Sequence, residues 1–222
     1  MRGNMPFPNA VIFDMDGLML DSEVLYQKAW KAAAAELGYQ LDDSLYLSLI
    51  GRSNVEAEAL FLKIFGADFP AAKFDQRWEA SWRQSLQAEG VPLKPGLLEL
   101  LDWLEKQEIP KAVGTSSKMA EAELCLSLAG ICDRFSIIVT VDQVAAGKPE
   151  PDIFREAAKR IGVSPVQCLV LEDSNAGVQA ANHAGMSVIM VPDLQIPTDQ
   201  SKAMALRVLP SLCDVLAWLQ SL

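Results

Sequence analysis

The chain is predicted to adopt an α/β fold, in which a parallel β-sheet carries helices on both faces and a helical insertion follows the first strand. Two observations predict this class. In the C-terminal half, short apolar runs alternate with helical patterns, which is typical of βαβ units and hence of a parallel sheet. Between Asp14 and Lys111, by contrast, the chain contains several helical patterns and no convincing strand.

Five short runs rich in Val, Ile and Leu are the predicted strands. They lie at residues 10–14, 111–115, 135–141, 167–172 and 187–191. The helical patterns between the later runs lie at 118–129, 151–162 and 175–185. Each of these three patterns ends at or just before a glycine, which is a common helix C-terminal signal.

Residues 21–90 form the predicted insertion. Its helical patterns lie at 22–37, 43–49, 54–65 and 73–89. The segment VPLKPG at 91–96 supplies Pro and Gly as a boundary, and a further helix is predicted at 97–107. The predicted domains are therefore a core built from 1–20 and 91–222, and a helical domain at 21–90.

Composition excludes several functions. A chain of 222 residues with 50% hydrophobic content can bury a sizeable core. A formal charge of −10 opposes attraction to nucleic acid or to an anionic membrane, since both bind through basic surfaces. No apolar stretch approaches the about 18 residues of a membrane span, and the first ten residues lack the apolar run of a signal peptide. We expect a cytoplasmic protein, and nothing demands more than a monomer.

The few cysteines and the single histidine restrict the chemistry further. The four cysteines form no CxxC pair, so free thiols are expected. His183 is the one histidine of the chain, which excludes a zinc site with several histidine ligands.

Polar and charged motifs follow four of the predicted strands. In chain order they are Asp14-Met15-Asp16-Gly17, Thr115-Ser116-Ser117, Gly147-Lys148-Pro149 and Glu172-Asp173-Ser174. Because the C-terminal ends of parallel strands lie along one edge of the sheet, these motifs are expected to converge there. Each motif alone has another interpretation: a turn or calcium loop, a helix cap, a solvated lysine, or acids at a helix N-terminus. Their order and common placement together favour a site.

The residue types at this edge predict phosphoryl chemistry. Several carboxylates converging with one lysine suit a hard divalent cation, and Mg²⁺ prefers carboxylate and carbonyl oxygens together with water and phosphate. A carboxylate beside such a cation can attack phosphorus and form an aspartyl phosphate. A second carboxylate two residues further on can move protons.

The segments DMDGLMLDSE, VGTSSK, GKPEPDIF and LEDSNAG, in this order with a helical insertion after the first, resemble the haloacid dehalogenase superfamily of phosphohydrolases. They are most similar to its branch with a helical cap after strand one, the beta-phosphoglucomutase and pseudouridine-5'-phosphatase type. The resemblance covers nearly the whole chain and is weakest at 40–90 and after 195. It implies a Rossmann-like core, with residues 21–90 as the cap domain.

The resemblance also implies roles for individual residues. Asp14 would be the nucleophile and Asp16 the general acid and base. The phosphoryl group would be bound by Gly17, Thr115, Ser116 and Lys148. Arg52, which lies beside Gly51 in the predicted cap, is either a substrate-facing cation or a solvated side chain. Magnesium would lie on Asp14, the Asp16 carbonyl and Asp173, with Glu172 as a further or water-mediated ligand.

The expected activity is Mg²⁺-dependent hydrolysis of a small phosphomonoester, such as a sugar phosphate or a nucleoside monophosphate, through an aspartyl phosphate. A sugar phosphomutase is the alternative enzyme. In the mutase a cap arginine and a histidine assist the reaction, and here those positions resemble Asn54 and Tyr26, which favours hydrolysis. A non-enzymatic receiver or binding protein with a stable aspartyl phosphate is the alternative from another class. The cap residues that would select the ester are the least readable part of the chain.

Overall fold

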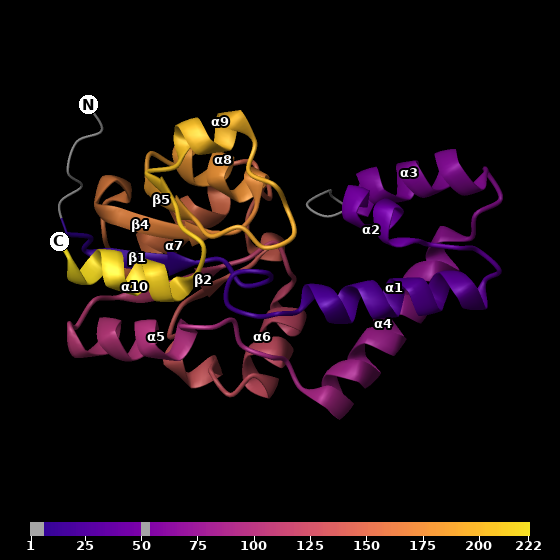
Figure 1. Cartoon of the computed structure of the whole chain (residues 1–222), viewed down its shortest axis with the longest axis horizontal. Coiled ribbons are helices and arrows are strands. Elements are labelled where there is room, and N and C mark those ends of the chain that lie inside the picture. Colours follow the sequence, from indigo (N-terminus) through magenta and orange to yellow (C-terminus); the bar gives the residue numbers. More distant parts are fainter. Residues whose placement is uncertain (1–6, 50–53) are drawn as a thin grey trace. The chain divides into compact units, whose positions relative to one another are not determined.

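The computed structural model describes residues 7–49 and 54–222, and the chain divides into two compact units (Figure 1). The core unit comprises Met1–Asp21 and Pro92–Leu222, and the helical unit comprises Ser22–Val91. The sequence-based boundaries of 20/21 and 90/91 lie within one residue of this division.

A six-stranded parallel sheet forms the centre of the core unit. Its strands are β1 (Ala10–Phe13), β2 (Lys111–Gly114), β3 (Ile138–Val139), β4 (Cys168–Glu172), β5 (Ser187–Met190) and β6 (Arg207–Val208). Their order in the sheet is β3-β2-β1-β4-β5-β6, and every pairing is parallel. The predicted α/β fold with a helical insertion after the first strand is confirmed. Strands β2 and β3 lie on one side of β1, and β4, β5 and β6 lie on the other. The switch point of the strand order is therefore between β1 and β4, where ligands bind in open α/β sheets.

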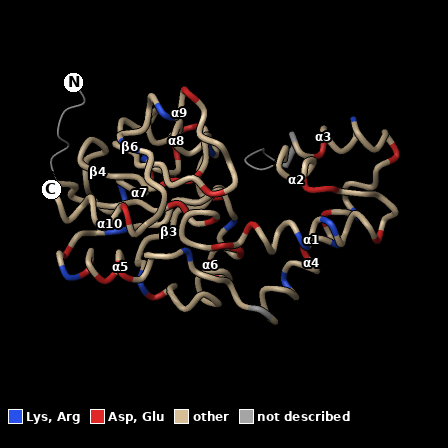
Figure 2. Tube along the Cα trace, in the orientation of Figure 1, with Lys and Arg blue, Asp and Glu red and all other residues tan. Residues whose placement is uncertain are grey.

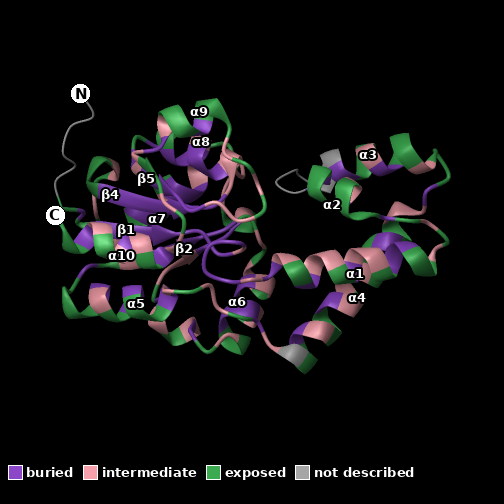
Figure 3. Cartoon of the chain, in the orientation of Figure 1, coloured by how far each residue is buried: buried purple, intermediate pink, exposed green. Residues whose placement is uncertain are grey.

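The middle strands are apolar because both of their faces are covered. All residues of β1 and of β4 are buried, as the purple strands in Figure 3 show. Alternate residues of these strands, including Ala10, Ile12 and Val170, belong to one core cluster with Ile153 of helix α7 (Asp152–Ile161) and Val178 of helix α8 (Asn175–His183).

Six α-helices accompany the sheet in the described part of the core unit. They are α5 (Leu97–Lys106), α6 (Met119–Leu128), α7 (Asp152–Ile161), α8 (Asn175–His183), α9 (Asp199–Met204) and α10 (Leu212–Gln220). Helices α5 and α10 lie side by side (Figure 1). Gly96, which precedes α5, permits this approach, because a Cβ there would lie 2.5 Å from the backbone nitrogen of Cys213.

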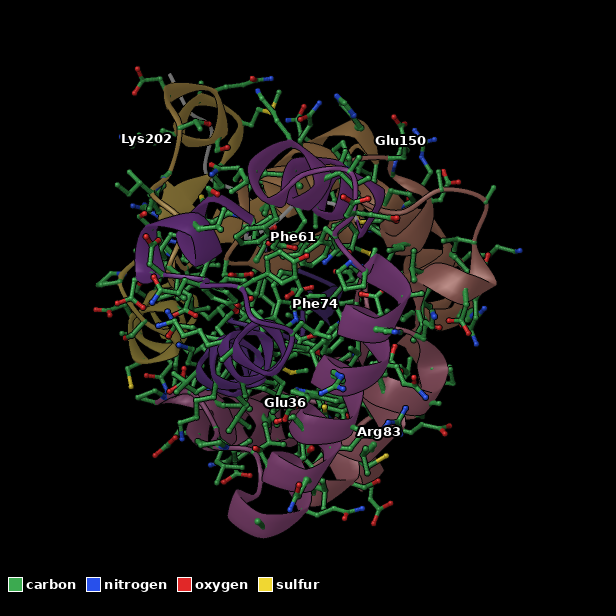
Figure 4. All side chains as sticks on the ribbon, turned by 90° about the vertical axis from the view of Figure 1, so that its right-hand side faces the viewer. Glu36, Phe61, Phe74, Arg83, Glu150 and Lys202 are labelled. Atoms are coloured by element: carbon green, nitrogen blue, oxygen red, sulfur yellow. The ribbon has the colours of Figure 1, made fainter. Side chains whose placement is uncertain are left out.

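The helical unit contains α1 (Glu23–Glu36), α2 (Asp43–Leu49), α3 (Asn54–Phe65) and α4 (Ala71–Glu89). Its interior is largely aromatic. Phe61 and Phe74, labelled in Figure 4, lie with ring centroids 5.0 Å apart, and Trp82 is buried. Small residues of α1, among them Ala29 and Ala33, are buried where α1 packs along α4. Aromatic packing therefore stabilises this insertion.

Two differences from the predicted elements have clear causes. The strand predicted at 135–141 is wrong in extent, because β3 contains only Ile138 and Val139, the two residues that pair with the end of β2. Phe135 instead leaves the sheet and packs edge-on against Phe13, with ring centroids 5.8 Å apart. Strand β6 and helices α9 and α10 are absent from the prediction. For β6 the cause is that both of its residues are exposed, so the strand has no apolar run.

Charge is dispersed over the described chain. Lys and Arg positions are scattered along the trace and interspersed with acids (Figure 2). The four cysteines are free thiols, of which Cys125 and Cys168 are buried. Within residues 7–49 and 54–222, every helix is too short or too polar to cross a bilayer.

Candidate active site

The carboxyl ends of β1, β2 and β4 bring the predicted motifs together. Asp14 directly follows β1, and its backbone N–H donates to the Leu171 carbonyl at 3.0 Å. Thr115 directly follows β2, and Glu172 is the last residue of β4. Since β1 lies between β2 and β4, and the order reverses beside it, the three ends meet at the position where α/β sheets bind ligands.

Lys148 joins two of the carboxylates. Its Nζ donates to Asp14 Oδ1 and, at 2.7 Å, to Glu172 Oε1. The side chains of Asp14, Lys148 and Glu172 are 8%, 5% and 1% exposed, so the pairing takes place almost without water. The ammonium group also lies 4.9 Å from the centroid of the Phe154 ring, which adds a cation–π contact. Because unpaired buried charge is costly, each of these groups depends on the others.

Negative charge exceeds positive charge in this cluster. Burial raises the pKa of the Asp14 carboxyl to about 7; Lys148 opposes this rise, and Glu172 adds to it. Burial alone would lower the pKa of Lys148, but the Asp14 and Glu172 carboxylates hold that pKa above its usual range. The lysine is therefore charged at neutral pH. One ammonium group does not suffice to keep Asp14 fully ionised.

With Asp173, the cluster contains three carboxylates that could together bind a metal ion. One carboxylate oxygen from each of Asp14, Glu172 and Asp173 lies within 4.8 Å of the others, and all three residues are buried. A donor set made only of carboxylate oxygens, with excess negative charge, fits a hard cation such as Mg²⁺. The residues present therefore suit the cation that the sequence predicted.

Glu172 is held by Ser174 and Gly177, for which no individual role was predicted. The backbone N–H and the hydroxyl of Ser174 donate to Glu172 Oε2 at 2.6 and 2.9 Å. A Cβ on Gly177 would lie 1.7 Å from Glu172 Oε1, so the carboxylate occupies the space that any larger residue there would fill. Ser174 also caps α8, since its hydroxyl accepts from the Gly177 N–H at 3.0 Å. Within the LEDSNAG segment, Ser174 thus holds the Glu172 carboxylate by hydrogen bonds, and Gly177 leaves the space that this carboxylate occupies.

Asp16 does not belong to this set of three carboxylates, and its side chain contacts Ser117. Its Oδ2 accepts a hydrogen bond from the Ser117 hydroxyl at 2.8 Å, and its side chain is partly exposed. Ser117 is in turn linked to Thr115, because the Ser117 N–H donates to Thr115 Oγ1 at 3.0 Å. Thr115 is buried, whereas Ser116 between them is exposed. The Thr-Ser-Ser motif thus provides a contact to Asp16 that the sequence did not reveal.

Gly17 lets the first loop approach Asp173. Its φ of +83° is a conformation that favours glycine, and a Cβ there would lie 2.5 Å from Asp173 Oδ2. Its contribution to phosphate binding stays a prediction. Arg52 lies outside the described residues.

A buried aspartate paired with a lysine, beside further carboxylates at the switch point of a parallel sheet, defines a site of phosphoryl-transfer type. The family model for haloacid dehalogenase-like hydrolases matches residues 11–191. The chain therefore belongs to the haloacid dehalogenase-like hydrolases, and it is a phosphatase of that class, a phosphoric monoester hydrolase.

Three relatives illustrate the relationship. Fructose-1-phosphate phosphatase YqaB from Escherichia coli is 36% identical over 82% of this chain and 95% of its own. A probable pseudouridine-5'-phosphatase from Drosophila melanogaster is 35% identical over 91% and 89%. The crystal structure of a putative beta-phosphoglucomutase from Thermotoga maritima matches with a TM-score of 0.80 at 27% identity over 96% and 99%. The branch that the motifs predicted is confirmed.

Proposed function

We propose that this protein is a Mg²⁺-dependent phosphatase of a small phosphorylated metabolite, and that it acts through an aspartyl phosphate on Asp14. The observation that carries the proposal is the buried Asp14 carboxylate, held by Lys148 beside Glu172 and Asp173. Its position at the end of β1 leaves it in the environment that a nucleophilic carboxylate needs, next to positive charge and away from bulk water.

In the first proposed step, a carboxylate oxygen of Asp14 attacks phosphorus while the bond from phosphorus to the ester oxygen breaks. Asp16 gives its proton to the departing oxygen. In the second step, Asp16 takes a proton from a water molecule, whose oxygen attacks phosphorus and releases inorganic phosphate and free Asp14. Ser117, which donates to Asp16 Oδ2, would hold that carboxyl during both transfers.

Lys148 would balance charge on the phosphoryl oxygens during both steps, and Thr115 and Ser116 would bind the same group by hydrogen bonds. Mg²⁺ would be held by Asp14, Asp173 and the Asp16 carbonyl, and when bound it supplies further positive charge to the phosphoryl oxygens. Both oxygens of Glu172 already accept hydrogen bonds, from Lys148 and Ser174. We therefore assign Glu172 to holding Lys148, with any contact to the cation made through water.

The proposed substrate class is a sugar phosphate, with a nucleoside monophosphate as the second class. Relatives named for fructose 1-phosphate and pseudouridine 5'-phosphate support the two classes. The structural relative named as a mutase makes sugar phosphomutase the competing activity. Tyr26 counts against it, because its ring stacks on Trp82 with centroids 5.1 Å apart and a phenol is a poor substitute for imidazole as a proton carrier near pH 7.

The test is phosphate release from a panel of phosphomonoesters by the wild type and by Asp14→Asn, each with Mg²⁺ and with EDTA. We expect turnover by the wild type with Mg²⁺, and loss of turnover in EDTA and in Asp14→Asn. Glu150→Gln, which changes an exposed acid of the core unit, is the matched control and should keep wild-type rates. Equal wild-type rates with Mg²⁺ and EDTA would contradict the proposal. Sugar-phosphate isomers formed without stoichiometric inorganic phosphate would establish the mutase.

A further inference from the structure

The loop that follows β5 brings another carboxylate to the same edge of the sheet. Asp193 lies three residues after the last residue of β5, and its side chain is 14% exposed. The point that a Cβ of Gly17 would occupy lies 3.5 Å from Asp193 Oδ2 and 2.5 Å from Asp173 Oδ2. The Oδ2 atoms of Asp173 and Asp193 therefore both lie next to Gly17.

The two oxygens of Asp193 differ in their partners. Oδ1 accepts a hydrogen bond from Lys94 Nζ at 2.6 Å. Oδ2 is buried and has no hydrogen-bond partner among the described residues. A buried carboxylate oxygen without a donor costs free energy, and native structures normally satisfy such an atom with protein or ordered water.

Lys94 fixes the orientation of Asp193. Besides Asp193, its Nζ contacts Asp21 Oδ1 at 3.0 Å, and its backbone N–H donates to the Met19 carbonyl at 2.9 Å. Lys94 is thus anchored to the segment that follows Gly17. Because Lys94 holds Oδ1, rotation of the carboxylate is restricted and Oδ2 stays directed toward Gly17 and Asp173.

We propose that Asp193 is a positioning residue for the cation, and that its Oδ2 accepts a hydrogen bond from a water molecule of the cation's coordination shell. The inference rests on the proposed function, since it requires the cation at Asp14 and Asp173. Mg²⁺ keeps several waters when it binds to proteins, and side chains that orient such outer ligands contribute to affinity. A water between Asp173 and Asp193 gives Oδ2 its donor and separates two carboxylates that would otherwise repel each other.

The test is the dissociation constant of Mg²⁺, measured by isothermal titration calorimetry without substrate. Asp193→Asn should weaken binding by about 10- to 100-fold, the usual effect of losing an outer-shell partner. Lys94→Met should weaken binding by less than Asp193→Asn does, because the carboxylate stays but loses the contact that orients it. Asp199→Asn, which changes a fully exposed acid of the same unit, is the matched control and should bind like the wild type. Melting temperatures in EDTA establish that each variant is folded.

A role limited to the ion pair with Lys94 would give a different pattern, because Lys94→Met would then weaken Mg²⁺ binding by the same factor as Asp193→Asn. That result overturns the inference, as does Asp193→Asn binding Mg²⁺ within about twofold of the wild type. Asp193→Ser serves for the same comparison if Asp193→Asn does not fold. Absence of Mg²⁺ binding by the wild type would instead refute the proposed cation, and with it this inference.

Discussion

Replacing Gly177 by alanine should displace the Glu172 carboxylate from Lys148. The new Cβ would lie 1.7 Å from Glu172 Oε1, 1.9 Å from Cδ and 2.5 Å from Oε2, far inside contact distance. Glu172 is fully buried and cannot rotate toward solvent without breaking its bonds to Lys148 and Ser174. The substitution therefore acts on the charge cluster from a residue that carries no side chain.

Two opposing terms set the magnitude. Alanine is favoured over glycine in a helix by about 1 kcal/mol, and Gly177 lies in the first turn of α8. Separating a buried ion pair typically costs about 3–5 kcal/mol, because a charge is left without its partner. We expect the free energy of unfolding to fall by about 2–4 kcal/mol. Phosphate release should fall with it, since Lys148 loses the carboxylate that holds it.

The assay is urea unfolding of Gly177→Ala, Glu172→Asp and the double variant, with phosphate release measured on each. Aspartate keeps the charge but is one methylene shorter, so it makes room for the new Cβ. In the Glu172→Asp background, Gly177→Ala should cost much less than it does alone, and this coupling identifies the clash as the cause. Gly177→Ala with wild-type stability and turnover would refute the reasoning, as would equal costs in the two backgrounds.

Two further predictions concern Asp16 and Asp14. Ser117→Ala removes the hydroxyl that donates to Asp16 Oδ2 and should lower kcat about tenfold with the fold intact. This factor corresponds to about 1.5 kcal/mol, the usual contribution of a hydrogen bond to a charged group. An unchanged kcat would contradict a role for Ser117 in proton transfer. In EDTA, Asp14→Asn should be more stable than the wild type at pH 8 by a few kcal/mol, since burial raises the pKa of Asp14 from 3.8 to about 7 and each unit corresponds to about 1.4 kcal/mol. As the pH rises from about 4 through 7, the folded wild type becomes less stable, because the buried Asp14 carboxyl loses its proton at a higher pH than in the unfolded chain. The difference in melting temperature between Asp14→Asn and the wild type should therefore vanish near pH 4. A difference that stays constant with pH would contradict this prediction.

The middle of the fold could be predicted because its elements are both long enough and fully buried. In β1 and β4 every residue is buried, so sequence hydrophobicity alone marks them as strands. Strand β6 has two exposed residues, Arg207 and Val208, and exists only because β5 lies beside it. Its hydrogen bonds are a tertiary property that no local pattern carries.

The same distinction applies to the site. The residue types of Asp14, Lys148, Glu172 and Asp173 carry chemical information, and strand ends in a parallel sheet must converge, so their meeting could be expected. The contributions of Ser117, Ser174 and Gly177 depend on distances of a few ångströms between side chains. No spacing in the sequence distinguishes Ser117, which contacts Asp16, from exposed Ser116 beside it.

The charge balance of the site explains why Asp14 and Asp16 follow an apolar strand, although acidic side chains are rarely buried in apolar surroundings. β1 is buried along its whole length, so Asp14 at its end inherits that burial, and Lys148 is the one basic side chain among the described residues that the structure pairs with it. Lys148 must also balance Glu172, which Ser174 and Gly177 hold in place. With Asp173 present as well, the cluster lacks positive charge, and that deficit matches a divalent cation. Local sequence rules fail most clearly where function imposes a cost on folding, and in this cluster the cost falls on residues that the proposed reaction uses.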